Sequence, residues 1–117
     1  MNLLKKSDGT IIARNIEFAD TMLKQTIGLM FRRDIPEDFA MIFDVIWEQY
    51  VDIHMMFVTF PIDLVYLNNE KKIVDLKKGL KPWTGMATPK SPARYVIEMP
   101  VGTVEKFYLK EGGVLEW

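Results

Sequence analysis

The feature that most restricts the fold of this chain is the order of its segments. Short apolar runs of strand-like composition follow one another, and a single longer segment has a clear helical pattern. Strands that alternate with helices favour a parallel sheet, whereas strands in runs favour antiparallel sheets joined by turns. The sequence therefore predicts an α+β domain built on a mostly antiparallel curled sheet or a small partly open β-barrel.

Two strand pairs are predicted to be hairpins, because turn residues separate their strands. Residues 7–10, Ser-Asp-Gly-Thr, divide two short apolar runs near the N-terminus. Residues 68–71, Asn-Asn-Glu-Lys, divide the runs 62–67 and 72–76 in the same way. Polar turns of this kind typically connect adjacent antiparallel strands. Further strands are expected over residues 15–19, 39–43, 50–57, 95–99 and 114–117.

Two helices are predicted. The main one covers about residues 21–31, where apolar side chains recur at the i, i+4, i+7 spacing that gives a helix one buried face. Gly28 would lie inside this helix and cost about 1 kcal/mol relative to alanine, so we assign it a structural role in close packing against a strand. A second, shorter helix covers about residues 103–108, with Thr103 as its cap.

Composition limits the class of protein. A length of 117 residues, 49% of them hydrophobic, indicates a single domain spanning residues 1–117. The sequence contains no cysteine, which excludes disulfides, thiolate metal sites and cysteine nucleophiles. Fifteen basic residues against sixteen acidic ones give a net charge of −1, so no nucleic-acid partner is predicted.

Hydropathy bears on location. No run of the roughly 18 apolar residues needed to span a bilayer occurs, so no membrane association is predicted. The first six residues, Met-Asn-Leu-Leu-Lys-Lys, lack the apolar stretch of an export signal, and we expect a cytoplasmic location. Nothing in the pattern indicates an oligomeric state.

Asp63 lies in the setting that most requires explanation. It is in the apolar run 62–67 directly after Pro61, and a carboxylate there needs a partner. Two explanations are open. Loop N–H groups would bond Asp63 and fix the start of the strand, or Arg32 would form a buried ion pair with it. A functional acid would use the same burial to shift its pKa. Pro61 and Gly102 are assigned structural roles.

His54 is the sole histidine, and it shares a predicted strand face with Asp52. The two side chains could reach one ligand, but a protein metal site normally has at least three protein ligands. No further histidine or cysteine exists, so neither a metal nor a cofactor is predicted. Established catalytic motifs such as GxSxG and HExxH are absent, and we assign no catalytic residue. A small hydrolase-like or metal-assisted enzyme using Asp52, His54 and Asp63 is the alternative function.

The segment 79–92 is rich in glycine and proline and predicts a surface loop long enough to bind a ligand. It contains Trp83. The preferred function is a small non-catalytic binding module with a groove near this loop, which takes a small molecule or a protein segment. The candidate ligand-binding residues are Arg32, His54, Met56, Asp63 and Trp83.

Several motifs occur in a fixed order. They are Gly28–Arg32 (GLMFR), Met41–Phe43, Met55, Pro61–Leu64 and Tyr95–Thr103. Together, over about residues 12–115, they resemble the family known as domain of unknown function 192, a group of uncharacterised prokaryotic proteins. The family pattern reads GLMFR, GMLF, WMKNT with PLD, and VLE with PAG. The resemblance implies an antiparallel, barrel-like α+β fold and no established activity.

The chain departs from that pattern at residues 54–58. The family often has Trp-Met-Lys-Asn-Thr there, and this chain has His-Met-Met-Phe-Val. Met56 and Phe57 therefore replace a lysine and an asparagine. If those polar groups contact a ligand in relatives, this chain binds something more apolar or lacks that site. Ala40 replaces a family glycine, which is a mild change.

Overall fold

The computed structural model describes residues 2–19 and 28–117. Most of the predicted main helix, about 21–31, therefore lies outside the described residues. The described elements are β1 (Leu4–Lys6), β2 (Ile11–Ala13), β3 (Asn15–Ala19), β4 (Phe39–Gln49), β5 (Ile53–His54), β6 (Ile62–Leu67), β7 (Ile73–Leu80), β8 (Met86–Ala87), β9 (Ala93–Pro100), α2 (Thr103–Lys106) and β10 (Leu115–Glu116).

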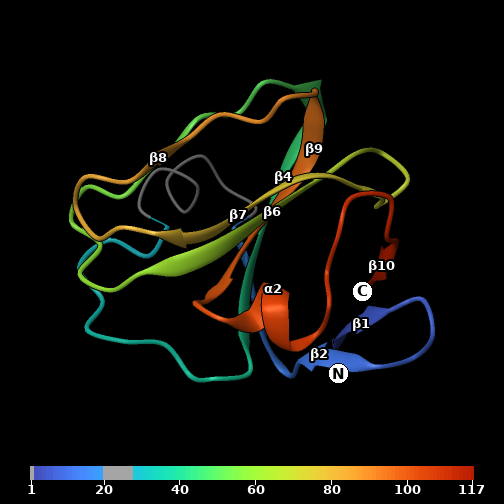
Figure 1. Cartoon of the computed structure of the whole chain (residues 1–117), viewed down its shortest axis with the longest axis horizontal. Helices are drawn as coiled ribbons and strands as arrows, with labels where there is room; N and C mark the ends of the chain where they lie inside the picture. Colours follow the sequence, from blue (N-terminus) through green and yellow to red (C-terminus); the bar gives the residue numbers. More distant parts are fainter. Residues whose placement is uncertain (1, 20–27) are drawn as a thin grey trace.

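A five-stranded sheet forms the centre of the molecule, in the order β3-β4-β9-β6-β7. β9 lies in its middle and pairs antiparallel with both β4 and β6. β1, β2 and β10 form a second antiparallel sheet, which lies beside α2, while β8 lies on the opposite side of the molecule (Figure 1). The predicted curled, mostly antiparallel α+β architecture is confirmed. Within the described residues the central sheet stays open, with β3 and β7 as its two edges.

One strand pair departs from the antiparallel pattern. β3 and β4 are consecutive among the described strands but run parallel, with Asn15 opposite Phe39 and Ala19 opposite Phe43. Parallel neighbours require a crossover connection instead of a tight turn. The sequence pattern gave no sign of this, because composition and alternation do not encode strand direction.

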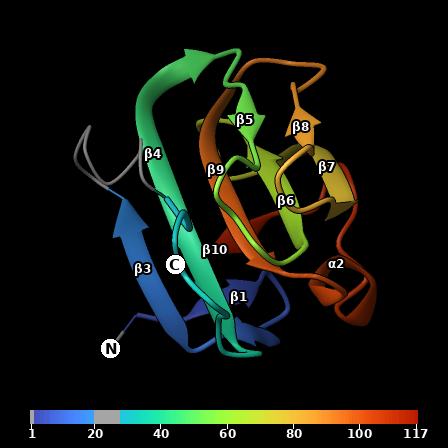
Figure 2. The same ribbon diagram turned by 90° about the vertical axis from the view of Figure 1, so that its left-hand side faces the viewer.

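The central sheet is buried on both faces, as β6 shows. All six of its residues are buried, including Tyr66 and Asp63. One face carries a core cluster shared with β1, β2, α2 and β10. The other face carries a second cluster, which the loops around residues 28–35, 51–60 and 80–93 cover. Figure 2 shows β5 and β8, which belong to this cover, in front of the central sheet.

Both hairpins are confirmed. β1 pairs with β2 around the 7–10 turn, where the Thr10 N–H donates to Asp8 Oδ1 at 2.9 Å. β6 pairs with β7 around the 68–71 turn, where Asn68 Oδ1 accepts from the N–H groups of Glu70 and Lys72. In each turn a short polar side chain accepts the backbone N–H groups that the turn leaves unpaired, as the sequence indicates.

Two helix predictions need correction. Gly28 lies in a turn with φ +50, and Phe31 follows with φ 66, so residues 28–31 do not continue a helix. Gly28 is therefore explained by a left-handed backbone more than by close packing. At α2 the cap is Gly102, with φ 95, and not Thr103, whose hydroxyl donates to the Pro100 carbonyl at 2.7 Å.

The predicted strand over residues 50–57 is mostly wrong. Only Ile53–His54 pairs, with β8, although Met55 is fully buried as expected. The side chain of Phe57, placed on the core face by alternation, is 40% exposed. The φ of 62 at Phe57 explains the exposure of this side chain, because a left-handed residue reverses the alternation on which the prediction depended. Among the described residues no helix is long and apolar enough to cross a membrane.

Candidate functional site

Asp63 holds the end of the central sheet together. The residue is fully buried, and its Oδ1 accepts a hydrogen bond from the Gly79 N–H at 2.9 Å. Its Oδ2 accepts from the N–H groups of Gly102 and Val104, both at 3.0 Å. This matches the first of the two explanations above, in which loop N–H groups bond the carboxylate. Asp63 joins β6, β7 and the first turn of α2, and it is not open to a ligand.

Arg32 pairs with a different acid, so the predicted Arg32–Asp63 ion pair is wrong. The Arg32 guanidinium forms a two-pronged hydrogen bond with Glu17, at 2.7 and 2.8 Å. It also lies over the ring of Phe39, 5.6 Å from the centroid. The bonds to Glu17 raise the pKa of Arg32. Sequence spacing could not show this, because β3 reaches Arg32 only through its parallel pairing with β4.

Glu98 is a buried acid that the sequence analysis does not single out. It lies in β9, opposite Met41 on one side and Leu64 on the other, and it is 6% exposed. No described group donates a hydrogen bond to its carboxylate, and burial raises its pKa to about 7, against the partial counteraction of the Arg32 charge. A signal was available, because Glu98 interrupts an apolar strand as Asp63 does.

Three loops, from separate parts of the chain, meet on the outer side of the second core cluster. Backbone hydrogen bonds join them. The Phe31 N–H donates to the Phe57 carbonyl at 2.9 Å, and the Trp83 N–H donates to the Met55 carbonyl at 3.0 Å. The Met55 N–H in turn donates to the Gly85 carbonyl at 2.9 Å. Their relative positions are therefore set by the backbone.

These loops present an aromatic cluster, which we define as Phe31, Phe57 and Trp83. The ring centroids of Phe31 and Phe57 are 5.0 Å apart, and those of Phe57 and Trp83 are 5.2 Å apart in an edge-to-face arrangement. The side chains are 73%, 40% and 51% exposed, respectively. Large apolar side chains that pack on one another at the surface expose area that would normally be buried.

All three residues of the aromatic cluster have a left-handed backbone, with φ values of 66, 62 and 65. This conformation is unfavourable for residues with a bulky side chain, and such outliers gather at functional sites. The unfavourable backbone conformation thus occurs at each of the three residues whose aromatic rings are exposed. The cluster is therefore the strongest candidate for a functional surface among the described residues.

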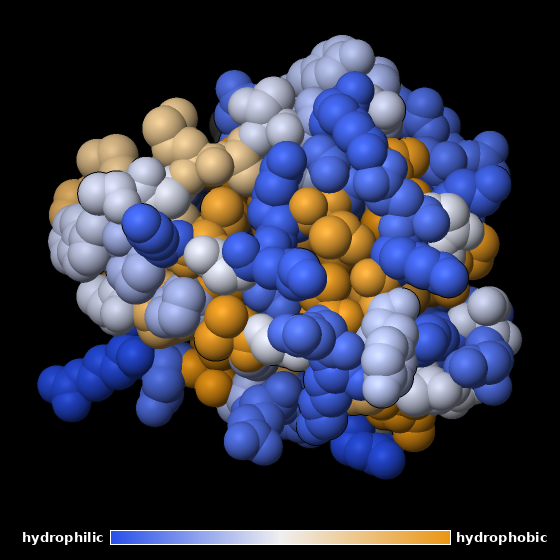
Figure 3. All heavy atoms as spheres, viewed as in Figure 1, coloured by the Kyte–Doolittle hydropathy of each residue, from blue (hydrophilic) through white to orange (hydrophobic). Residues whose placement is uncertain are grey.

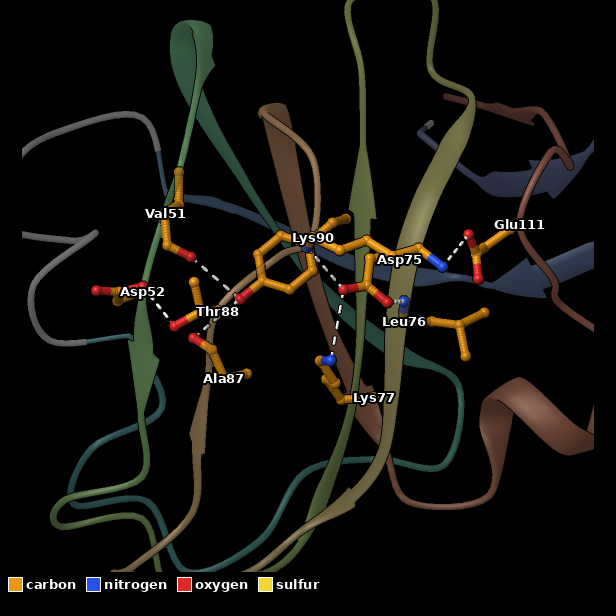
Figure 4. Close-up of polar contacts among 10 residues, drawn as sticks. Val51, Asp52, Asp75, Leu76, Lys77, Ala87, Thr88, Lys90 and Glu111 are labelled. Atoms are coloured by element: carbon orange, nitrogen blue, oxygen red, sulfur yellow. Dashed lines mark hydrogen bonds and ion pairs between the residues drawn. The ribbon is translucent and has the colours of Figure 1, made fainter.

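Buried polar contacts fix two of the loops that flank the cluster. The Tyr66 hydroxyl donates to the carbonyls of Val51 and Ala87, at 3.1 and 3.2 Å (Figure 4). Burial, together with nearby acids, raises the pKa of this phenol above its ordinary value, so it stays a donor. The Thr88 hydroxyl adds a bond to Asp52 at 2.8 Å. The loops on either side of β5 and β8 are thus tied to each other and to the sheet.

Asp75 anchors the segment after β8 to β7. Its carboxylate accepts from the N–H groups of Leu76 and Lys90, at 2.8 and 3.0 Å, and it lies 3.4 Å from the Lys77 ammonium (Figure 4). Burial alone would raise the pKa of Asp75, but these bonds and the Lys77 charge outweigh it and hold the pKa below its usual value.

The structure does not bring the proposed hydrolase residues together as a unit. His54 is exposed, and its Nδ1 accepts from the Met56 N–H at 3.2 Å. Asp52 is exposed and bonds Thr88, while Asp63 is sealed beneath β7 and α2. Within the described ranges no group of three His, Cys, Asp or Glu side chains is placed to hold a metal ion.

The other predicted site residues are spread over the surface of the molecule. Met56 is 53% exposed and directly precedes Phe57, and Pro61 is exposed at the entrance to β6. Two shallow hollows, of about 190 and 170 Å³, lie instead beside α2, where both include Glu37, Lys106 and Phe107 in their lining. The face seen in Figure 1 shows hydrophobic residues between hydrophilic ones near its centre (Figure 3).

Comparison with known families decides the affiliation. The model of DUF192, described as "Uncharacterized ACR, COG1430", matches residues 3–117. The chain belongs to this family. A UPF0127 protein of Pyrococcus furiosus is 36% identical over 117 residues, covering 98% of this chain and 97% of its own length. A UPF0127 protein of Thermococcus sibiricus is 32% identical and covers 98% of this chain and 73% of its own length. The predicted family resemblance is thereby confirmed.

Solved structures share the fold of this DUF192 member. A protein from Sinorhizobium meliloti, provisionally described as a transcription regulator, superposes with a TM-score of 0.87 at 25% identity, over 97% of this chain and 89% of its own. A protein of unknown function from Novosphingobium aromaticivorans gives a TM-score of 0.84 at 22% identity, over 98% of this chain and 82% of its own. DUF192 remains a family of uncharacterised function.

Proposed function

We propose that this DUF192 member is a small non-catalytic binding module whose recognition surface is the aromatic cluster. The observation that carries the proposal is the combination of exposure and strain. Three aromatic rings in contact with one another remain exposed, each on a left-handed residue, and backbone hydrogen bonds hold their loops together. A surface fixed before binding loses little conformational freedom when a ligand arrives.

Composition favours an apolar protein segment as the ligand. Two methionines, Met56 next to Phe57 and Met86 in β8, are 53% and 75% exposed. Aromatic residues and methionine are the types enriched at the centres of protein interfaces, and the flexible thioether adapts to varied partners. The overall charge of −1 gives no support to a nucleic-acid ligand, so the description of the Sinorhizobium meliloti protein is not carried over to this chain.

Phe57 makes the surface specific to this chain. Its φ of 62 belongs to the region where asparagine is the best tolerated residue after glycine, and the family pattern has asparagine at this position. The backbone conformation therefore suits the usual family residue better than the phenylalanine found here. We infer that relatives with asparagine share the loop geometry without this aromatic surface, and that they recognise a more polar ligand.

A peptide library tests the proposal directly. Random peptides displayed on phage are selected against the wild-type protein, and enriched sequences are measured as synthetic peptides by isothermal titration. We expect apolar peptides whose affinity falls at least tenfold in Trp83→Ala. The matched control is Tyr108→Ala, which removes an aromatic residue that is 82% exposed, also with positive φ, and outside the cluster. Equal binding by wild type and Trp83→Ala, or the absence of any enriched peptide, would overturn the proposal.

A further inference from the structure

Two carboxylates, Glu17 and Glu98, lie along one row of the central sheet, beneath the loop that carries Phe31 and Arg32. Glu17 in β3 pairs with Met41 in β4, and Met41 pairs with Glu98 in β9. Paired residues in a sheet direct their side chains to the same face. Arg32 lies over this face, bonded to Glu17, and its charge also acts on Glu98. One guanidinium therefore lies within the influence of two carboxylates.

The two carboxylates differ in their surroundings. The side chain of Glu17 is 47% exposed in its pair with Arg32, whereas Glu98 is 6% exposed and receives no hydrogen bond from the described residues. The 6% exposure of Glu98 leaves the residue in partial contact with solvent. A proton can thus reach Glu98 and leave it without unfolding of the sheet.

Energetics decide which carboxylate Arg32 prefers in each state. The Arg32–Glu17 pair is partly exposed, so solvent screens its attraction and compensates both groups when the pair separates. An ionised carboxylate buried without a partner is strongly destabilised, and a nearby guanidinium relieves that penalty. When Glu98 is neutral, moving Arg32 away from Glu17 gives no electrostatic stabilisation in return. When Glu98 loses its proton, the stabilisation of its buried charge by Arg32 exceeds the stabilisation lost at Glu17.

The position of Arg32 is linked to the aromatic cluster by its own backbone. Arg32 directly follows Phe31, and its carbonyl accepts a hydrogen bond from the Thr59 hydroxyl at 3.1 Å. The Phe31 N–H bonds the Phe57 carbonyl. We propose that Glu98 is a proton-controlled switch: its ionisation transfers Arg32 from Glu17 to Glu98 and shifts Phe31 relative to Phe57 and Trp83. This inference concerns the free protein and holds whatever the cluster binds.

The described groups that face Glu98 are few. β4 and β6 contribute the apolar side chains of Met41 and Leu64, and β6 also contributes Tyr66, whose hydroxyl is held by two carbonyls. The turn after Gly28 contributes Arg32, and β3 contributes Glu17 through Arg32. Every test variant carries His54→Gln, because this removes the sole imidazole of the chain from the measurement.

The test is a pH titration by NMR between about pH 5 and 8.5, a range that includes the raised pKa of Glu98. Side-chain carboxyl ¹³C signals report Glu98, and the indole ¹⁵N–H signal of Trp83, assigned with Trp83→Phe, reports the cluster. Both signals are expected to move with one midpoint. Glu98→Gln should abolish the movement of the Trp83 signal. Glu17→Gln should lower the Glu98 midpoint by at least about half a pH unit, because the carboxylate of Glu17 then no longer competes for Arg32.

Each outcome is decisive. A Glu98 signal that titrates only below pH 5 overturns the switch, and so does a Trp83 signal that still moves in Glu98→Gln. An unchanged midpoint in Glu17→Gln contradicts the transfer of Arg32 between the two acids. Glu98→Gln keeps the size of the side chain and removes only its ionisation, and its NMR spectrum shows whether the fold is retained.

Discussion

At the scale of single residues, two buried carboxylates in neighbouring strands have opposite roles. Asp63 receives three backbone N–H groups, whereas Glu98 receives none from the described residues. A carboxylate bonded in this way contributes to stability, and one without partners reduces it. The sequence context of the two is alike, so the difference comes entirely from which loops fold over them.

Asp63→Asn should destabilise the protein by about 2–4 kcal/mol, because the new amide would direct its own N–H groups at backbone donors. Urea unfolding measures the change. Asp8→Asn, at an exposed aspartate that bonds only a local turn, is the control and should change the unfolding free energy by less than about 0.5 kcal/mol. A double-mutant cycle with Arg32→Gln should give no coupling, and a coupling above about 1 kcal/mol would restore the rejected ion pair.

Glu98 makes the stability depend on pH with a defined sign. The folded-state pKa of Glu98, about 7, exceeds its unfolded value of 4.5. Its stabilising contribution is thus complete below about pH 4.5 and is lost as pH rises to about 7. The unfolding free energy of Glu98→Gln should therefore exceed that of wild type increasingly over this range, by up to about 3 kcal/mol at pH 8. A difference that does not vary with pH would contradict the raised pKa that burial gives Glu98.

At the scale of elements, the loops that carry the aromatic cluster depend on one close contact. A Cβ atom at Gly85 would lie 2.6 Å from the Lys81 carbonyl oxygen and 2.9 Å from Met55 Cγ. The turn of residues 81–85, which places Trp83, therefore exists only with glycine at this position. Neither the Gly/Pro content of the segment nor its length gives this detail.

Gly85→Ala should destabilise the protein by about 1–3 kcal/mol through overpacking and alter the fluorescence of Trp83. Gly112→Ala is the matched control. Its φ of +90 is unfavourable for alanine, but nothing lies within 4 Å of the added Cβ, so it should cost about 1 kcal/mol and leave Trp83 unchanged. Equal fluorescence spectra for wild type and Gly85→Ala would show that the turn does not position Trp83.

At the scale of the whole molecule, the sequence predicted the class of fold and its hairpins well. Alternating apolar residues and turn chemistry are local, and they identified β6, β7 and most of β9. Strand direction is a tertiary property, which is why the parallel pair of β3 and β4 was missed. A left-handed residue with a bulky side chain such as Phe57 violates local preference, and of the strand predicted over residues 50–57 the structure forms only Ile53–His54.

The candidate site could be predicted only in part, for a related reason. The 79–92 loop predicts Trp83 as a site residue, the expected strand over residues 50–57 contains the candidate Met56, and the structure places Trp83 in the aromatic cluster. Phe31 and Phe57 were read as helix and core residues, because their exposure depends on positive φ values that local patterns do not reveal. The sequence analysis offers Arg32 as a partner for Asp63 because a carboxylate in an apolar run needs one. Their actual partners come from segments distant in the sequence.

The most direct test of the central claim is the replacement of Phe57 by the asparagine of the family pattern. Phe57→Asn relieves left-handed strain and removes two ring contacts, so the unfolding free energy should stay within about 1 kcal/mol of wild type. Titration of a library-selected peptide into the same variant should show at least a tenfold loss of affinity. A stable Phe57→Asn protein that binds the peptide as well as wild type would contradict the assignment of the aromatic cluster as the recognition surface.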